Sequence, residues 1–108
     1  MATSTIKNPN IIGGINGKVV TVAKSSSVTF NVTAPLQLFM IVDGNESGLK
    51  GAYVINENST YAFSVGTILS ASSVSITADA TNHTITIQNT STGSSLVLML
   101  FYMNGRID

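Results

Sequence analysis

The side chains that could perform acid–base or metal chemistry are few and widely separated in this chain. His83 is the only histidine and cysteine is absent, which excludes disulfides, thiolate metal sites and clusters of imidazole ligands. No G-x-S-x-G segment is present to place a serine nucleophile on a sharp turn. We predict that His83 lies on an exposed turn. The sequence therefore predicts a protein that is not an enzyme and that holds no metal or cofactor.

Acidic residues could also act as catalytic groups or as metal ligands. We interpret four of them as loop residues: Asp43, Glu46, Glu57 and Asp79. Two carboxylates hydrolyse a glycosidic bond only where the fold brings them together. No aromatic cleft signature accompanies these four. Residues 43–48 (DGNESG) contain oxygen ligands that calcium accepts, but they lack the full ligand series of an EF-hand loop. We interpret this segment as a polar turn.

The elements that position these residues are predicted to be β-strands. From Lys18 onward, apolar and polar residues alternate with period two, which is typical of strands with one buried face. We predict strands at Lys18–Ala23, Ser27–Thr33, Leu36–Asp43, Ala52–Asn56, Tyr61–Val65, Ser73–Ala78, His83–Gln88 and Ser95–Met103. About eight short strands without a helix predict a single antiparallel, jelly-roll-like β-sandwich, with a meander from Ser73 to Met103.

The first 17 residues differ from the rest. They mix Asn, Pro, Gly and Ile without a sustained period, and they contain several turn signals. We predict an extended N-terminal arm at 1–17, followed by the sandwich domain at 18–108. The final residues, 104–108 (NGRID), are interpreted as a short polar tail.

Two predicted strands are apolar on both faces. They are 36–42 (LQLFMIV), with Gln37 as the exception, and 95–103 (SLVLMLFYM). We expect them to be central, because a strand with one wetted face would alternate. One set of side chains fills the sandwich, and the other set requires a partner surface or loops of the same chain. We assign a homo-oligomer interface to Leu38, Met40, Leu98, Leu100 and Tyr102.

Composition excludes several classes of partner. Charged residues make up 9% of the chain and the formal net charge is zero. Nucleic-acid binding requires clustered Lys and Arg, and the five basic residues here are scattered. No run approaches the ~20 apolar residues of a membrane helix, so we predict no membrane insertion.

The chain is similar to the small trimeric β-sandwich heads that end bacteriophage tail fibres and receptor-binding proteins. The resemblance lies in the Asn- and Gly-rich lead (8–17), the run 51–67 (GAYVINENSTYAFSVGT), the hairpin 78–88 and the apolar closing strand. It implies a homotrimer in a virion or extracellular location, with receptor contacts in distal loops. The candidate receptor-binding residues are Asp43, Asn45, Glu46, Lys50 and Tyr53. Tyrosine can present its ring to a sugar, but in a half-buried strand it also packs in the core.

Three functions remain open. The first is an adhesion module that binds a bacterial surface receptor, with a saccharide as the expected ligand. The second is a structural virion protein, such as a capsid decoration or head-fibre component, which docks on other virion proteins through its arm. The third is a small enzyme, for which the chain supplies no catalytic constellation. The chain begins at Met1 without a shaft, which favours an excised head or a small independent virion protein.

Overall fold

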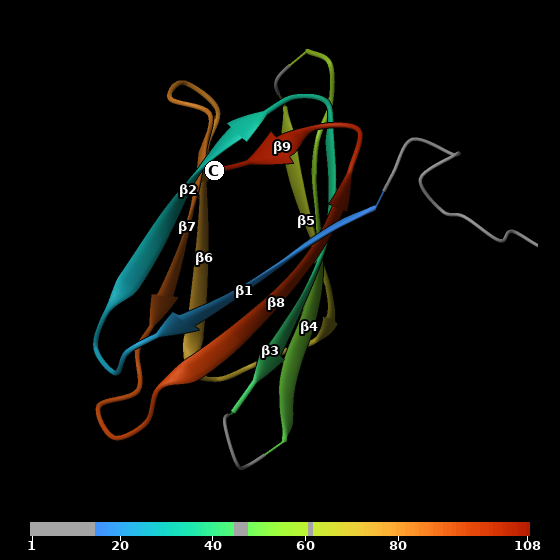
Figure 1. The fold of residues 1–108 in the computed structure, drawn as a ribbon. Coiled ribbons are helices and arrows are strands. Elements are labelled where there is room, and N and C mark those ends of the chain that lie inside the picture. Colours follow the sequence, from blue (N-terminus) through green and yellow to red (C-terminus); the bar gives the residue numbers. More distant parts are fainter. Residues whose placement is uncertain (1–14, 45–47, 61) are drawn as a thin grey trace, which may run out of the picture.

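A computed structural model describes residues 15–44, 48–60 and 62–108, which form two antiparallel β-sheets (Figure 1). The first sheet has the order β1–β8–β3–β4–β5, and the second has the order β6–β7–β2–β9. The strands of the first sheet are β1 Asn16–Val22, β8 Leu96–Met103, β3 Leu36–Asp43, β4 Leu49–Glu57 and β5 Phe63–Leu69. Those of the second are β6 Val74–Asp79, β7 Thr84–Asn89, β2 Ser27–Thr33 and β9 Arg106–Ile107. The described residues contain no helix, and the predicted all-β sandwich is confirmed.

The two doubly apolar stretches form β3 and β8, which are interior strands of the five-stranded sheet. β8 pairs with β1 on one side and with β3 on the other, and β3 pairs in turn with β4. Strands from the beginning and the end of the chain therefore lie side by side (Figure 1). Such long-range antiparallel neighbours are typical of jelly-roll-like windings. The predicted central position of these two strands is confirmed.

The structure differs from the sequence prediction in strand order, at both ends of the chain and in the limits of two strands. β4 begins at Leu49 rather than at Ala52, and β5 spans Phe63–Leu69 rather than 61–65. β7 pairs with β6 and β2, whereas β8 lies in the other sheet, so the predicted meander ends at β7. β1 begins at Asn16, which pairs with Tyr102, so the end of the predicted arm belongs to the sandwich. Residues 1–14 lie outside the described part. The predicted polar tail contains β9, where Ile107 pairs with Val32.

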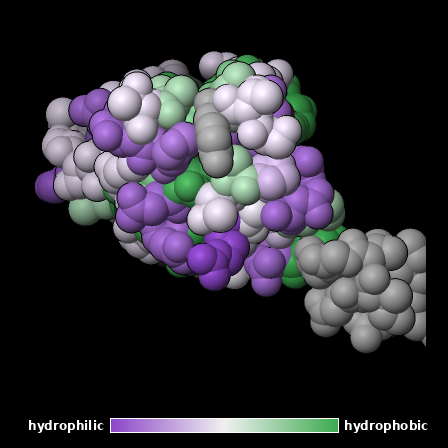
Figure 2. Space-filling model, turned by 90° about the horizontal axis from the view of Figure 1, so that it is seen from above, coloured by the Kyte–Doolittle hydropathy of each residue, from purple (hydrophilic) through white to green (hydrophobic). Residues whose placement is uncertain are grey.

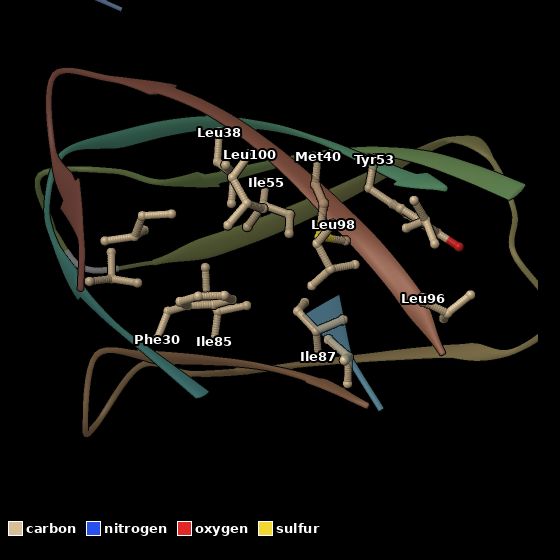
Figure 3. Packing of buried hydrophobic residues seen from close by; sticks show 14 of the residues in the cluster. Phe30, Leu38, Met40, Tyr53, Ile55, Ile85, Ile87, Leu96, Leu98 and Leu100 are labelled. Atoms are coloured by element: carbon tan, nitrogen blue, oxygen red, sulfur yellow. The ribbon is translucent and has the colours of Figure 1, made fainter. Parts of the chain in front are cut away.

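The core lies between the sheets and is built from alternate residues of each strand. Figure 3 shows Leu38 and Leu100 pointing from the five-stranded sheet toward Phe30, Ile85 and Ile87 of the other. Fully burying an aliphatic side chain of this size stabilises a fold by about 1.5–3 kcal/mol. A register shift of one residue would expose every one of these side chains, so burial fixes the register.

The strand connections gather at two ends of the sandwich. At the serine end, in the lower part of Figure 1, β1 leads to β2 and β7 leads to β8, and this end carries Ser73, Ser91 and Ser94. At the histidine end, in the upper part, β4 ends at Glu57 and His83 lies in the turn between β6 and β7. Seen from above in Figure 2, the histidine end is mostly hydrophilic or neutral, with smaller hydrophobic areas.

Candidate functional site

Asn89, the last residue of β7, holds the serine end together. Its side chain is fully buried. Its Nδ2 donates hydrogen bonds to the backbone oxygens of Val22 (3.1 Å), Ala23 (3.3 Å) and Ser94 (2.9 Å). Its Oδ1 accepts a hydrogen bond of 3.0 Å from the backbone N–H of Ser91. One amide side chain therefore fixes the turn after β1 relative to the turn after β7.

Backbone hydrogen bonds extend this frame to the connection between β5 and β6. The N–H of Thr90 donates to the oxygen of Ser73, and the N–H of Ser25 donates to the oxygen of Ser91, each at 2.8 Å. Three connections that are distant in sequence are thus joined through their main chains. Side chains displayed on them have a rigid support, as a binding surface on loops requires.

A polar hollow of about 120 Å³ lies at this end, lined by Gly44, Lys50, Ser73, Ser91, Ser94 and Leu96. Serine hydroxyls donate and accept hydrogen bonds, and the lysine ammonium donates three. A Cβ atom at Gly44 would lie 2.7 Å from Cγ of Lys50, so the absence of a side chain at position 44 leaves room for the lysine. The arrangement suits a small polar ligand that carries hydroxyl or anionic groups.

The structure places two of the predicted receptor-binding residues at or beside this hollow. Lys50 is exposed and lines it, and Asp43 is half-buried at the end of β3, one residue before the lining residue Gly44. Asn45 and Glu46 lie outside the described residues. The three serines of the hollow were not predicted, because they come from connections that meet only in the folded chain.

Tyr53 lies in the core, and its assignment to a receptor surface is wrong. Its side chain is only 5% exposed. Its hydroxyl accepts a hydrogen bond of 2.7 Å from the backbone N–H of Ala71. The ring therefore packs between the sheets while its hydroxyl satisfies a buried donor in the connection between β5 and β6. Of the two roles that the sequence left open for this tyrosine, packing is correct.

Four of the predicted oligomer-interface residues lie in the core, and their assignment is wrong. Leu38, Met40, Leu98 and Leu100 are buried between the sheets (Figure 3), and Tyr102 is half-buried against the same cluster. A side chain enclosed within one chain cannot contact a second copy. The alternation along both strands is as predicted, and the outward set is Phe39, Ile41, Val97, Met99, Phe101 and Met103.

The outward surface of the five-stranded sheet is apolar across its centre. Strand register aligns two neighbouring rows across all five strands: Val19, Met99, Ile41, Ala52 and Leu69 in one, and Gly17, Phe101, Phe39, Val54 and Gly66 in the other. We call these ten residues the apolar face. Among the large side chains of this face, the exposed fractions are largest at Val19 (70%), Val54 (44%), Leu69 (44%), Phe101 (42%) and Phe39 (37%), whereas Ala52 is buried.

The two phenylalanines form the middle of the apolar face. Their rings stack with centroids 6.4 Å apart and an interplanar angle of 28°. A hollow of about 250 Å³ lies beside them, lined by Ile15, Gln37, Leu38, Phe39, Val54, Phe101, Tyr102 and Met103. The flanking rows bring polar residues to the edges of the face: Thr21 and Asp43 on one side, and Gln37, Asn56 and Ser64 on the other.

A buried carboxylate in contact with the histidine at the histidine end was not predicted from the sequence. Glu57 is fully buried, and its Oε2 lies 3.0 Å from Nδ1 of His83. Among the described residues, its Oε1 has no hydrogen-bond partner. The placement of Glu57 in a loop is wrong, since it ends β4 on the inner face. The alternation after Tyr53 and Ile55 contained the signal, because position 57 is next in that inward series.

Asp79 shapes the turn that presents His83. Its carboxylate accepts hydrogen bonds from the backbone N–H of Thr81 (2.9 Å) and Asn82 (3.1 Å), and from the Asn82 side chain (2.9 Å). The bonds from the backbone and then the side chain of Asn82 lower the pKa of Asp79 below its ordinary value of 3.8. His83 itself adopts a left-handed φ of 55°.

No group of three or more His, Cys, Asp or Glu side chains that could hold a metal ion occurs in the described part of the chain. Within the same residues, no helix is long and apolar enough to cross a membrane. Comparison of the chain with protein-family models, with curated proteins and with solved structures finds no match.

Proposed function

We propose that this protein is a non-enzymatic adhesion module of a virion, and that its serine end binds a saccharide on a bacterial surface. The observation that carries the proposal is the polar hollow of about 120 Å³, whose three serines come from connections joined by hydrogen bonds. Binding surfaces on loops require this combination of exposed polar groups and a rigid support. The virion setting rests on the resemblance to trimeric fibre heads.

The chemistry of the hollow favours a hydroxyl-rich ligand. Sugar hydroxyls can exchange hydrogen bonds with the serine hydroxyls, and the Lys50 ammonium can bind a sugar hydroxyl or carboxylate. Leu96 adds an apolar contact for the carbon skeleton of the ring. A hollow of this size encloses only part of one sugar unit, so a single site binds weakly. Several copies on one particle raise the overall affinity without new contacts, as a multivalent fibre head would.

Binding to immobilised bacterial surface glycans, compared between matched variants, tests this function. Lys50→Ala removes the cationic group of the hollow, and we expect it to reduce binding at least fivefold. Arg106→Ala is the matched control, because it also removes one positive charge, from an exposed residue of β9 at the other end of the sandwich (Figure 1). Equal binding by Lys50→Ala, by a Ser91→Ala and Ser94→Ala double variant, and by the parent protein would overturn the proposal.

A further inference from the structure

We infer that the apolar face is the surface through which copies of this chain pack against one another. The inference deepens the proposed trimeric module, on which it rests for its setting, by naming the contact between subunits. The interface is thereby assigned to the outward residues of β3 and β8, and no longer to the inward residues of the same strands, which are Leu38, Met40, Leu98, Leu100 and Tyr102. The saccharide hollow plays no part in it.

The composition of the apolar face matches the anatomy of a protein interface. Its two central rows are apolar throughout, and the rows beyond them mix polar with apolar residues. The polar ones are Thr21, Asp43, Gln37, Asn56 and Ser64, and the apolar ones are Leu49, Val97 and Met103. Interfaces typically combine an apolar centre rich in Phe and Met with a polar rim. The sheet therefore has an apolar centre, and its polar residues begin in the rows beyond that centre.

The size of the apolar face is adequate for a stable contact. Side chains of these types at these exposed fractions leave several hundred Å² of apolar surface in water, the upper range for a soluble monomer. A standard interface buries about 800 Å² on each partner. The two apolar rows supply the larger part of that area, and the rows on both sides supply the remainder.

Charge favours a second copy over a charged partner. Among the residues of the apolar face and its polar rim, Asp43 is the only one with a charge. An acidic or basic partner would gain no attraction there. The whole chain has a formal net charge of zero, so two copies approach without mutual repulsion. A neutral, apolar partner surface is required, and every copy of this chain carries one.

Gly17 and Gly66 provide an independent indication of a partner. They stand at the two edges of the row that contains Phe101, Phe39 and Val54. A Cβ atom at either glycine would meet no heavy atom closer than 3.8 Å, and neither glycine has a positive φ. The folding of one chain therefore does not require glycine at these positions, although glycine weakens a strand. Close approach of another backbone explains both.

The test is the mass in solution, measured by light scattering on a sizing column. We expect the parent protein to have a mass that is a multiple of 11.3 kDa. Phe101→Lys places a charge at the middle of the apolar face, and Gly66→Val adds a side chain at its edge without an internal clash. Both variants are expected to elute as folded monomers. Val65→Lys is the control, because Val65 is similarly exposed at 44% but pairs with inward Ile55 on the opposite face.

The outcomes separate this inference from the proposed function. A monomeric parent protein, or a multimer that Phe101→Lys and Gly66→Val leave intact, overturns the inference. If Phe101→Lys fails to fold, Gly66→Val decides, since a β-branched residue favours the strand. If a variant is a folded monomer that still binds saccharide, with lower affinity than the parent protein, both the interface and the proposed function are supported. If the parent protein is a multimer that binds no saccharide, the interface is supported and the proposed function is overturned.

Discussion

Oε2 of Glu57 and Nδ1 of His83 lie 3.0 Å apart and join the two sheets of the sandwich. Glu57 comes from the end of β4, and His83 comes from the turn between β6 and β7. The carboxylate is fully buried, whereas the imidazole side chain is 37% exposed. Because His83 is the only hydrogen-bond partner of this carboxylate among the described residues, the contact is expected to contribute to stability despite its position near the surface.

Replacing His83 with alanine is expected to destabilise the fold by about 2–4 kcal/mol, because removal of one partner leaves a buried carboxylate unpaired. The free energy of unfolding, measured in urea at neutral pH, gives the value. A second change tests the cause: Glu57→Gln in the His83→Ala background should restore part of the loss, since a neutral amide is less costly to bury. If the double variant is less stable than His83→Ala alone, an unpaired charge is not the reason.

Asn89→Ala is expected to destabilise the protein by about 2–3 kcal/mol, because three backbone oxygens lose their side-chain donor. The loss should also loosen the serine end, so hydrogen exchange of the backbone amides of Ser25 and Ser91 should accelerate. Thr90→Ala is a suitable control, because the exposed Thr90 contributes its main chain to this frame. Unchanged exchange at Ser25 and Ser91 in Asn89→Ala would show that the main-chain bonds hold the end without the amide.

The sequence predicted local features of this fold well. Alternation placed Phe30 and Val32 inward, and it gave the limits of β2 and β3 as they are observed. These features depend only on the period of two along one strand. β9 was missed because a strand of two residues shows no period.

The features that were not predicted depend on contacts between distant segments. Both faces of β8 are apolar, so the sequence could not tell which set faces the other sheet, and Leu98 was assigned outward. The hollow at the serine end joins Lys50 with Ser73 and Ser91. Nothing in the spacing of these three residues along the chain indicates that they meet.

Asp79 makes the stability of the fold sensitive to acid. Its pKa is lower in the folded chain than the ordinary value of 3.8, because the backbone and side chain of Asn82 donate hydrogen bonds to the carboxylate. A lowered folded pKa gives stabilisation that is present above the unfolded pKa and is lost as the pH falls toward the folded pKa. The urea midpoint should therefore fall less steeply below about pH 4 in Asp79→Asn than in the parent protein. Parallel pH profiles would contradict this role for Asp79.

Gly105, between β8 and β9, is expected to tolerate no side chain. A Cβ atom there would overlap the backbone oxygens of Thr33 and Pro35 and lie 2.9 Å from the carbonyl carbon of Pro35. Main-chain atoms cannot move aside as a flexible side chain can, so Gly105→Ala should cost about 2–3 kcal/mol in the free energy of unfolding. Gly93→Ala is the matched control, because a Cβ atom at Gly93 has no heavy atom within 4 Å. Equal urea midpoints for the two variants would mean that β9 shifts to accommodate the methyl group and that its contact with β2 contributes little.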